Sequence, residues 1–188
     1  MKKILSVLSM LFVLCTGAFA ENVINLGISL PFETHSKSNI RFDYMSGDIH
    51  ISTFNSDTIG FGAGLGYWKM LRGTNLETGV VADANSSEPM YLDLSMGAAI
   101  KVMDSDQYSL ILTPGLAFQT CPSASSLYMY VGPSCDLLFT YKLMGFIGLS
   151  AGVQFDYYMY LFNFENPEYS GQKDVYAIIP RIGITLDL

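Results

Sequence analysis

The sequence lacks any long apolar run that could cross a membrane as a helix, although 50% of its 188 residues are hydrophobic. A spanning helix needs about 20 consecutive apolar residues, and no run beyond the N-terminal segment approaches that length. Once such a chain is exported, high apolar content without helical spans fits a protein of the bacterial outer membrane that crosses with strands.

The side chains that carry most enzyme and metal chemistry are also scarce. The chain has 2 histidines, His35 and His50, and neither shows Ser/His/Asp or metal-ligand spacing. We therefore predict no catalytic residue, no metal site and no cofactor. Both histidines are interpreted as solvated loop residues.

Few cysteines remain after the N-terminal segment. Cys121 and Cys135 would lie in an oxidising compartment, where pairing is the default expectation. If a hairpin closes through residues 121–126, however, Cys135 lies about 30 Å down its strand. A disulfide needs Cα atoms within roughly 7 Å, so we predict two free thiols, with Cys135 facing lipid.

Basic residues are outnumbered, with 10 Lys and Arg against 17 Asp and Glu and a net charge of −7. Lys2 and Lys3 precede an apolar stretch and an A-x-A sequence that ends at Ala20. This pattern predicts a signal peptide over residues 1–20, cleaved after Ala20, and a mature domain over residues 21–188. An acidic exported chain argues against a nucleic-acid partner.

A two-residue alternation is the clearest pattern that is present. In Val175–Leu188, Ile178, Ile182 and Ile184 share one face, and Arg181 lies on the other. A strand repeats every two residues, and similar alternation recurs along the chain. We therefore predict an all-β fold, an antiparallel up-and-down transmembrane β-barrel.

Eight segments show this alternation and are the predicted strands. They are Asn22–Glu33, Thr58–Trp68, Asn75–Asn85, Met90–Met103, Tyr108–Gln119, Leu127–Tyr141, Phe146–Phe162 and Val175–Leu188. Their outward faces carry no charged residue, and one Lys or Arg at the bilayer midplane would cost about 2–4 kcal/mol. Two shorter stretches in His35–Asp57 are interpreted as a hairpin above the membrane; a ten-stranded barrel is the alternative.

The connections alternate between short turns and longer loops, as in outer-membrane barrels. Predicted periplasmic turns are Lys69–Thr74, Asp104–Gln107 and Lys142–Gly145, with both termini periplasmic. Predicted outer connections are His35–Asp57, Ser86–Pro89, Thr120–Ser126 and Asn163–Asp174.

Aromatic residues are predicted to form two belts at the membrane–water interfaces, which Tyr and Trp favour. The periplasmic belt includes Tyr67, Trp68, Tyr108 and Tyr141, and the outer belt includes Tyr128, Tyr130, Tyr158, Tyr160 and Tyr176.

A polar cluster is predicted inside the barrel. Its members are Arg181 and the possible partners Asp156, Gln154, Asp136, Asp93 and Asn25. Arg181 could be a gating or solute-contacting charge, but a structural ion pair in a filled lumen is favoured, because eight strands enclose only enough room for side chains. Inward glycines at residues 60, 62, 64 and 66 could open space for a ligand, but more often make room for bulky neighbours.

Together, the signal, the eight alternating strands and the final strand resemble the small outer-membrane barrels of the OmpX, OmpW and OmpA-barrel type. The last strand looks like their assembly signal, except that it ends in Leu188 instead of Phe or Tyr. The resemblance implies outer-membrane lipid and the barrel-assembly machinery as partners. The resemblance concerns fold and location and implies no activity. The predicted function is that of a non-enzymatic integral barrel for passive passage of small or apolar solutes or for structural support. The alternative is an adhesin or immune-evasion barrel that binds a host surface ligand through residues 35–57 and 163–174.

Overall fold

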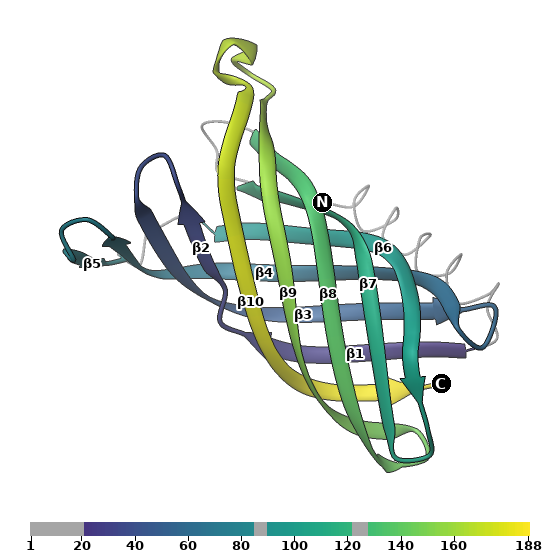
Figure 1. Cartoon of the computed structure of the whole chain (residues 1–188). Helices are drawn as coiled ribbons and strands as arrows, with labels where there is room; N and C mark the ends of the chain where they lie inside the picture. Colours follow the sequence, from purple (N-terminus) through teal and green to yellow (C-terminus); the bar gives the residue numbers. More distant parts are fainter. Residues whose placement is uncertain (1–20, 85–89, 122–127) are drawn as a thin grey trace, which may run out of the picture.

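A computed structural model of the chain describes residues 21–84, 90–121 and 128–188. Nearly all of these residues lie in one antiparallel sheet that closes on itself (Figure 1). Its strands are β1 (Glu21–Ser29), β2 (Phe32–His35), β3 (Ile40–Phe54), β4 (Ile59–Asn75), β5 (Val81–Asp83), β6 (Met90–Asp104), β7 (Tyr108–Cys121), β8 (Tyr128–Met144), β9 (Ile147–Asn163) and β10 (Gly171–Asp187). A 3-10 helix, η1 (Pro167–Tyr169), joins β9 to β10.

Three predicted segments lie mostly or wholly outside the described residues. They are the signal peptide over residues 1–20, the connection Ser86–Pro89 and most of the connection Thr120–Ser126. Among the described residues, no helix is long and apolar enough to cross a membrane.

The barrel is a ring of eight strand positions, because β1 and β2 share one position. β1 pairs with β3 on one side and β10 on the other, and β2 does the same. Hydrogen bonds carry the ladder across the break between them, from Leu30 N to Pro180 O (3.1 Å) and from Tyr44 N to Pro31 O (2.9 Å). β5 pairs only with the end of β4. The predicted all-β antiparallel barrel of eight strands is confirmed.

One predicted strand was nevertheless wrong, and one strand of the barrel was not predicted. The segment interpreted as an outer hairpin, His35–Asp57, contains β3, which pairs along the lengths of β1 and β4. The predicted turn Lys69–Thr74 is instead the continuation of β4. The predicted strand Asn75–Asn85 holds only a turn and the short β5. The prediction missed the strand β3 and added the strand Asn75–Asn85, so the predicted total of eight strands was still correct.

Both ends of the described chain meet at one end of the barrel, which we call the termini end. Asn22 N donates to Leu188 O (2.9 Å), and Leu188 N donates to Asn22 O (2.8 Å). The opposite end, which carries the β2–β3 turn, β5 and η1, is called the loop end. In Figure 1, the β9–β10 hairpin projects beyond the other strands at this end.

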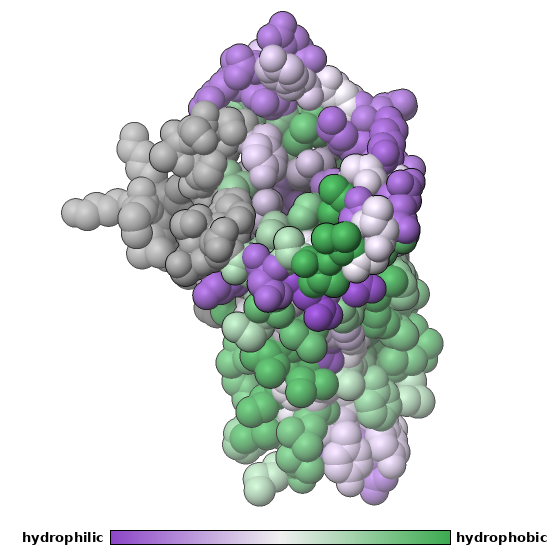
Figure 2. Space-filling model, turned by 90° about the vertical axis from the view of Figure 1, so that its left-hand side faces the viewer, coloured by the Kyte–Doolittle hydropathy of each residue, from purple (hydrophilic) through white to green (hydrophobic). Residues whose placement is uncertain are grey.

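The two faces of the wall have opposite chemistry. Outward side chains are mostly apolar and exposed, as for Ile28, Leu149 and Ile182, while inward side chains are largely polar and buried. Figure 2 shows the apolar residues gathered over the lower part of the visible surface and hydrophilic residues over the upper part. This is the arrangement expected for a barrel that faces lipid outside and carries polar groups inside.

Candidate functional site

The six residues of the predicted polar cluster all lie buried on the inner face of the barrel. They are Asn25, Asp93, Asp136, Gln154, Asp156 and Arg181. They do not form one cluster, however. The structure divides them among three hydrogen-bonded groups at different heights in the lumen.

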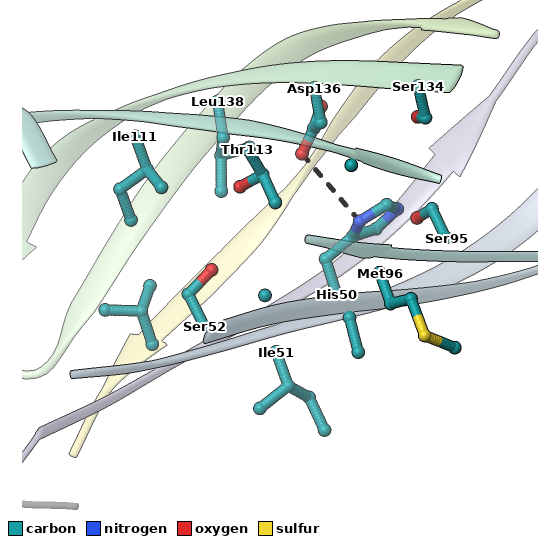
Figure 3. A pocket seen from close by; sticks show the side chains of 14 residues that line it. His50, Ile51, Ser52, Ser95, Met96, Ile111, Thr113, Ser134, Asp136 and Leu138 are labelled. Atoms are coloured by element: carbon teal, nitrogen blue, oxygen red, sulfur yellow. Dashed lines mark ion pairs between the residues drawn. The ribbon is translucent and has the colours of Figure 1, made fainter. Parts of the chain in front are cut away.

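Arg181 lies at the centre of the first group. Its guanidinium forms an ion pair with Asp136 of β8 and a hydrogen bond with His50 of β3. His50 Nδ1 also lies 3.8 Å from Asp136 Oδ2, the pair joined by the dashed line in Figure 3. Gly152 leaves room for this arrangement, because a Cβ there would lie 3.0 Å from Arg181 Nε. Of the predicted partners, only Asp136 is paired directly with Arg181.

The interpretation of His50 as a solvated loop residue was wrong. It lies within β3 and points into the lumen with Ser46, Asp48 and Ser52. The alternation of these polar residues with Met45, Ile49 and Ile51 is the signal that could have identified a strand with a polar inner face. His35 is half-buried at the end of β2, where its Nε2 lies 2.6 Å from Glu33 Oε1.

Asn25 belongs to a second group toward the termini end. Its amide donates to Ser150 Oγ and, at 3.1 Å, to Thr185 Oγ1. Thr185 in turn lies 3.2 Å from Thr140 Oγ1. These bonds connect β1, β8, β9 and β10 through short polar side chains on their inner faces. Asn25 does not contact Arg181 in this group.

Asp93 and Asp156 belong to the third group, toward the loop end, and Tyr158 joins them. The Tyr158 hydroxyl lies 2.7 Å from Asp93 Oδ1 and 3.3 Å from Asp156 Oδ2. Gln154 Nε2 donates to both oxygens of Asp156, at 2.9 and 3.0 Å. Buried carboxylates are costly unless they are hydrogen-bonded, and these donors supply the bonds.

Glu33 extends this group and was not predicted. It is buried, its Oε2 accepts a bond from Gln119 Nε2 (2.6 Å), and its Oε1 faces the Tyr44 hydroxyl (3.4 Å). The sequence placed Glu33 at the end of a strand on its polar face, but nothing local showed which residues would surround it. Tyr44 comes from the neighbouring strand β3, but Gln119 comes from β7, 86 residues away in the chain.

Aromatic side chains fill the lumen next to this group. Tyr44, Trp68 and Tyr158 are buried, and Tyr91 and Tyr130 pack against them. The Tyr44 ring centroid lies 5.3 Å from that of Trp68 and 5.6 Å from that of Tyr91. We call these five residues the aromatic plug.

The structure therefore corrects the predicted aromatic belts. Trp68 was expected at the periplasmic lipid interface, but it is 1% exposed, inside the barrel, in the half of β4 nearer the loop end. It shares the inner face of β4 with Gly60, Gly62, Gly64 and Gly66, so strict alternation already placed it inside the barrel. Tyr130 and Tyr158 were expected on the outer lipid face and also lie inside, as does Tyr128, which pairs in register with the buried Cys121.

The other predicted belt residues lie on the outer face. Tyr108 and Tyr141 are in ring contact with each other, 5.5 Å apart, at the termini end. Tyr67 and Tyr176 are exposed nearer the loop end, and Tyr67 therefore lies opposite to its expected position. Tyr160 packs on Phe162, with centroids 4.6 Å apart.

Ion pairs close the lumen at the termini end. Lys101 is buried and pairs with Glu21 and Asp104, the latter at 3.2 Å. Lys142 lies 2.8 Å from Asp104 and 3.7 Å from Asp187. Lys101 Nζ also lies 4.6 Å from the Phe54 ring centroid. These five charged residues are called the ion cap.

Little space remains between these groups. The cavity beside His50 and Asp136 measures about 10 Å³ (Figure 3), and a cavity needs roughly 10–15 Å³ to hold one water molecule. The inward glycines of β4 are covered by neighbours: a Cβ at Gly64 would overlap the His50 imidazole, and one at Gly66 would lie 2.8 Å from Trp68 Nε1.

The described residues contain no group of three or more His, Cys, Asp or Glu side chains that could hold a metal ion. Cys121 is buried on the inner face, Cys135 is half-buried, and both are free thiols. The register pairs Cys121 with Tyr128 and Cys135 with Pro114. Ser126, expected opposite Cys121, lies outside the described residues.

No protein-family model matches the sequence. No curated protein sequence matches it either. Solved structures do match: Neisserial surface protein A has a TM-score of 0.60 and 12% identity, over 88% of this chain and 96% of that one. OprG from Pseudomonas aeruginosa has a TM-score of 0.58 and 12% identity, over 91% and 97%. Ail, the attachment invasion locus protein of Yersinia pestis, has a TM-score of 0.53 and 10% identity, over 90% and 99%.

The chain has the fold of a small outer-membrane β-barrel. Each of these proteins is covered almost completely, so the likeness extends over whole barrels. At such low identity the likeness concerns the fold, and fold alone does not determine function. The lumen and the outer surface of the barrel are therefore the features that bear on its function.

Proposed function

We propose that the protein is a non-enzymatic integral barrel of the outer membrane whose lumen is filled, so that it serves as a membrane-embedded support for its outer surface and does not pass solutes. The observation that carries this proposal is the small central cavity of about 10 Å³. A conducting barrel needs a continuous water-filled path, and eight strands leave an interior that side chains can fill.

Closure at both ends supports the same proposal. The ion cap lies at the termini end, and the aromatic plug lies toward the loop end. A solute would have to displace the ion pairs of the ion cap, the buried Arg181–Asp136 pair and several packed rings in succession. Separating a buried ion pair leaves costly uncompensated charges, and packed aromatic rings stabilise each other.

In the proposed orientation, the termini end faces the periplasm and the loop end faces outward. The termini end has short turns, such as residues 105–107 and 145–146, while the loop end carries β5 and the β9–β10 hairpin. Short periplasmic turns and longer outer connections are typical of such barrels. The partners are then outer-membrane lipid and the barrel-assembly machinery.

The non-enzymatic part rests on the surroundings of the two histidines. Within the described part of the chain, the ring nitrogens of His35 and His50 contact Glu33, Arg181 and Asp136. A hydrolase needs a nucleophile within hydrogen-bond reach of its base, and these contacts occupy the imidazoles with charged partners.

Release of encapsulated sugars from proteoliposomes tests the proposal. The mature barrel should release a small sugar no faster than empty liposomes. A known porin reconstituted in the same liposomes serves as the open control. Release by the unaltered protein at the rate of a known porin would reject the proposal in favour of passive passage.

A surface-interaction role is the second candidate, and one observation favours it. Phe164 and Tyr169, in the connection between β9 and β10, are 56% and 64% exposed. One structural neighbour, Ail, is named as an attachment protein and was solved with the heparin analogue sucrose octasulfate. The predicted interaction segment 163–174 remains a candidate, but only residues 36–39 of segment 35–57 form a turn at the loop end.

Binding of immobilised heparin by the mature barrel tests this role. The double variant Phe164→Ser/Tyr169→Ser should lower binding if the hairpin is the contact surface. The matched control is Phe61→Ser, which removes an exposed aromatic ring from the wall of the barrel. Equal binding by both variants would exclude the hairpin.

A further inference from the structure

Charged side chains begin abruptly where the apolar outer wall of β3 and β4 ends. Asp43 lies 2.9 Å from Arg41 Nε and 2.5 Å from Arg72 Nε. Asp43 is buried beneath the two guanidiniums, whose side chains remain 38% and 50% exposed. We call Arg41, Asp43 and Arg72 the arginine pair site.

The register places this site on the outside of the barrel. Asp43 stands opposite Arg72 on β4 and opposite Phe32 on β2, and the Arg41 guanidinium lies 5.8 Å from the Phe32 ring centroid. The neighbouring residues Phe42 and Tyr44 point inward, where both pack in or against the aromatic plug. The arginines therefore lie on the lipid-facing side of the wall, at its upper edge.

The site retains hydrogen-bond donors that its own acid cannot use. Each guanidinium has five N–H donors in a planar fork, whereas the two oxygens of Asp43 serve both arginines. Lys69 is exposed on the same face of β4, just below, opposite Met45. Asp83, opposite Arg72 on β5, is the other acid in the ladder here. Three cations thus face two carboxylates.

An apolar groove lies on the outer wall below the site. Its apolar side chains are Leu26, Ile28, Ile49, Leu149, Ile182 and Ile184, and the lining is completed by Gly27, Gly47, Asp48, Ser150 and Gly183. Gly47 adds no side chain to the wall here, and the space beside it is open: a Cβ at this position would meet nothing within 4 Å. Gly47 is four residues from Asp43 on β3, or about 13 Å at the rise of a strand, a distance that an acyl chain can span.

We infer that the arginine pair site and the groove together bind one outer-leaflet lipid with a phosphate-bearing head group. The planar forks of Arg41 and Arg72 match phosphate oxygens, and an acyl chain of the same molecule lies over Gly47. Basic groups at a membrane interface recognise lipid head groups in this way. The inference rests on the proposed placement in the outer membrane with the loop end outward.

The test measures lipid retained by the folded mature barrel in native mass spectrometry, with diphosphoryl lipid A as the probe. The double variant Arg41→Gln/Arg72→Gln should weaken binding on the order of tenfold, as expected for loss of a charged hydrogen bond. Lys173→Gln is the matched control, because it removes a cation from β10 at the same end. This control should bind like the unaltered protein.

Two further measurements distinguish a lipid head group from free phosphate as the ligand, and a third tests the groove. Dephosphorylated lipid A should bind more weakly, and inorganic phosphate at equal concentration should not compete. Gly47→Leu, which fills the groove without changing charge, should also weaken lipid binding. Equal binding by the arginine double variant and the control, or full competition by inorganic phosphate, would overturn the inference. Unboiled gel migration checks folding, and failure of the closed-lumen proposal would appear separately as sugar release.

Discussion

The guanidinium of Arg181 is enclosed by a barrel whose outer wall is apolar, so the cost of removing it from water must be offset by its neighbours. Asp136 supplies the opposite charge and His50 a hydrogen-bond contact. A buried pair of this kind adds little net stability compared with apolar residues, but removing one partner leaves a costly buried charge. At the residue scale, the lumen is therefore sensitive to single changes.

Arg181→Ala should destabilise the barrel by about 3–5 kcal/mol if Asp136 is left uncompensated in a poorly hydrated interior. The measurement is equilibrium unfolding in urea from lipid vesicles. The double variant Arg181→Ala/Asp136→Ala should recover part of the loss, because it removes both charges. Unchanged stability in the single variant would mean that water or ions already solvate this part of the lumen.

Glycines on the inner and outer faces of the wall should differ in how much stability is lost when they are changed to alanine. Gly64→Ala places a methyl group against the His50 imidazole and Ser95, and overpacking of this kind costs about 1–3 kcal/mol. Gly47→Ala adds the same methyl group where nothing lies within 4 Å and should leave stability almost unchanged. Urea unfolding compares the two, and similar losses would contradict the assigned faces.

At the scale of elements, β3 and β4 show what alternation alone could not decide. β6 to β10 were predicted to within a few residues because apolar and polar residues alternate along them. In β3, the sequence Ser46-Gly47-Asp48 has the composition of a turn, yet Ser46 and Asp48 face the lumen and Gly47 faces outward. Asp48 accepts a hydrogen bond from Ser29 of β1 (2.7 Å), a contact that no local pattern reveals.

Arginine substitutions can determine whether the segment of β3 or the segment of β5 crosses the membrane. Ile49→Arg places a charge on the outer face of β3 within the apolar wall and should impair insertion, at a cost of about 2–4 kcal/mol near the midplane. Val81→Arg lies on β5, which pairs only with the end of β4, and should insert normally. Refolding yield into vesicles is the measurement; the reverse result would restore the sequence-based assignment of both segments.

At the scale of the whole molecule, the fold could be predicted from the sequence, but the site could be predicted only as a set of residues. The six cluster residues were placed on the inner face because their strand parity requires it. Their division into three groups depends on which strands become neighbours and on side chains such as Tyr158 and Gln119 that reach across the lumen. The aromatic plug was missed because Tyr and Trp also favour membrane interfaces.

A closed lumen is the central claim of this account, and single-channel recording of the mature barrel in planar lipid bilayers tests it most directly. Folding is checked first by the difference in migration between unboiled and boiled samples, and a known porin serves as the open control. We predict no stepwise conductance from the unaltered protein, because the ion cap, the Arg181–Asp136 pair and the aromatic plug lie in succession along the lumen. Regular, reproducible conductance steps from the unaltered protein would contradict it.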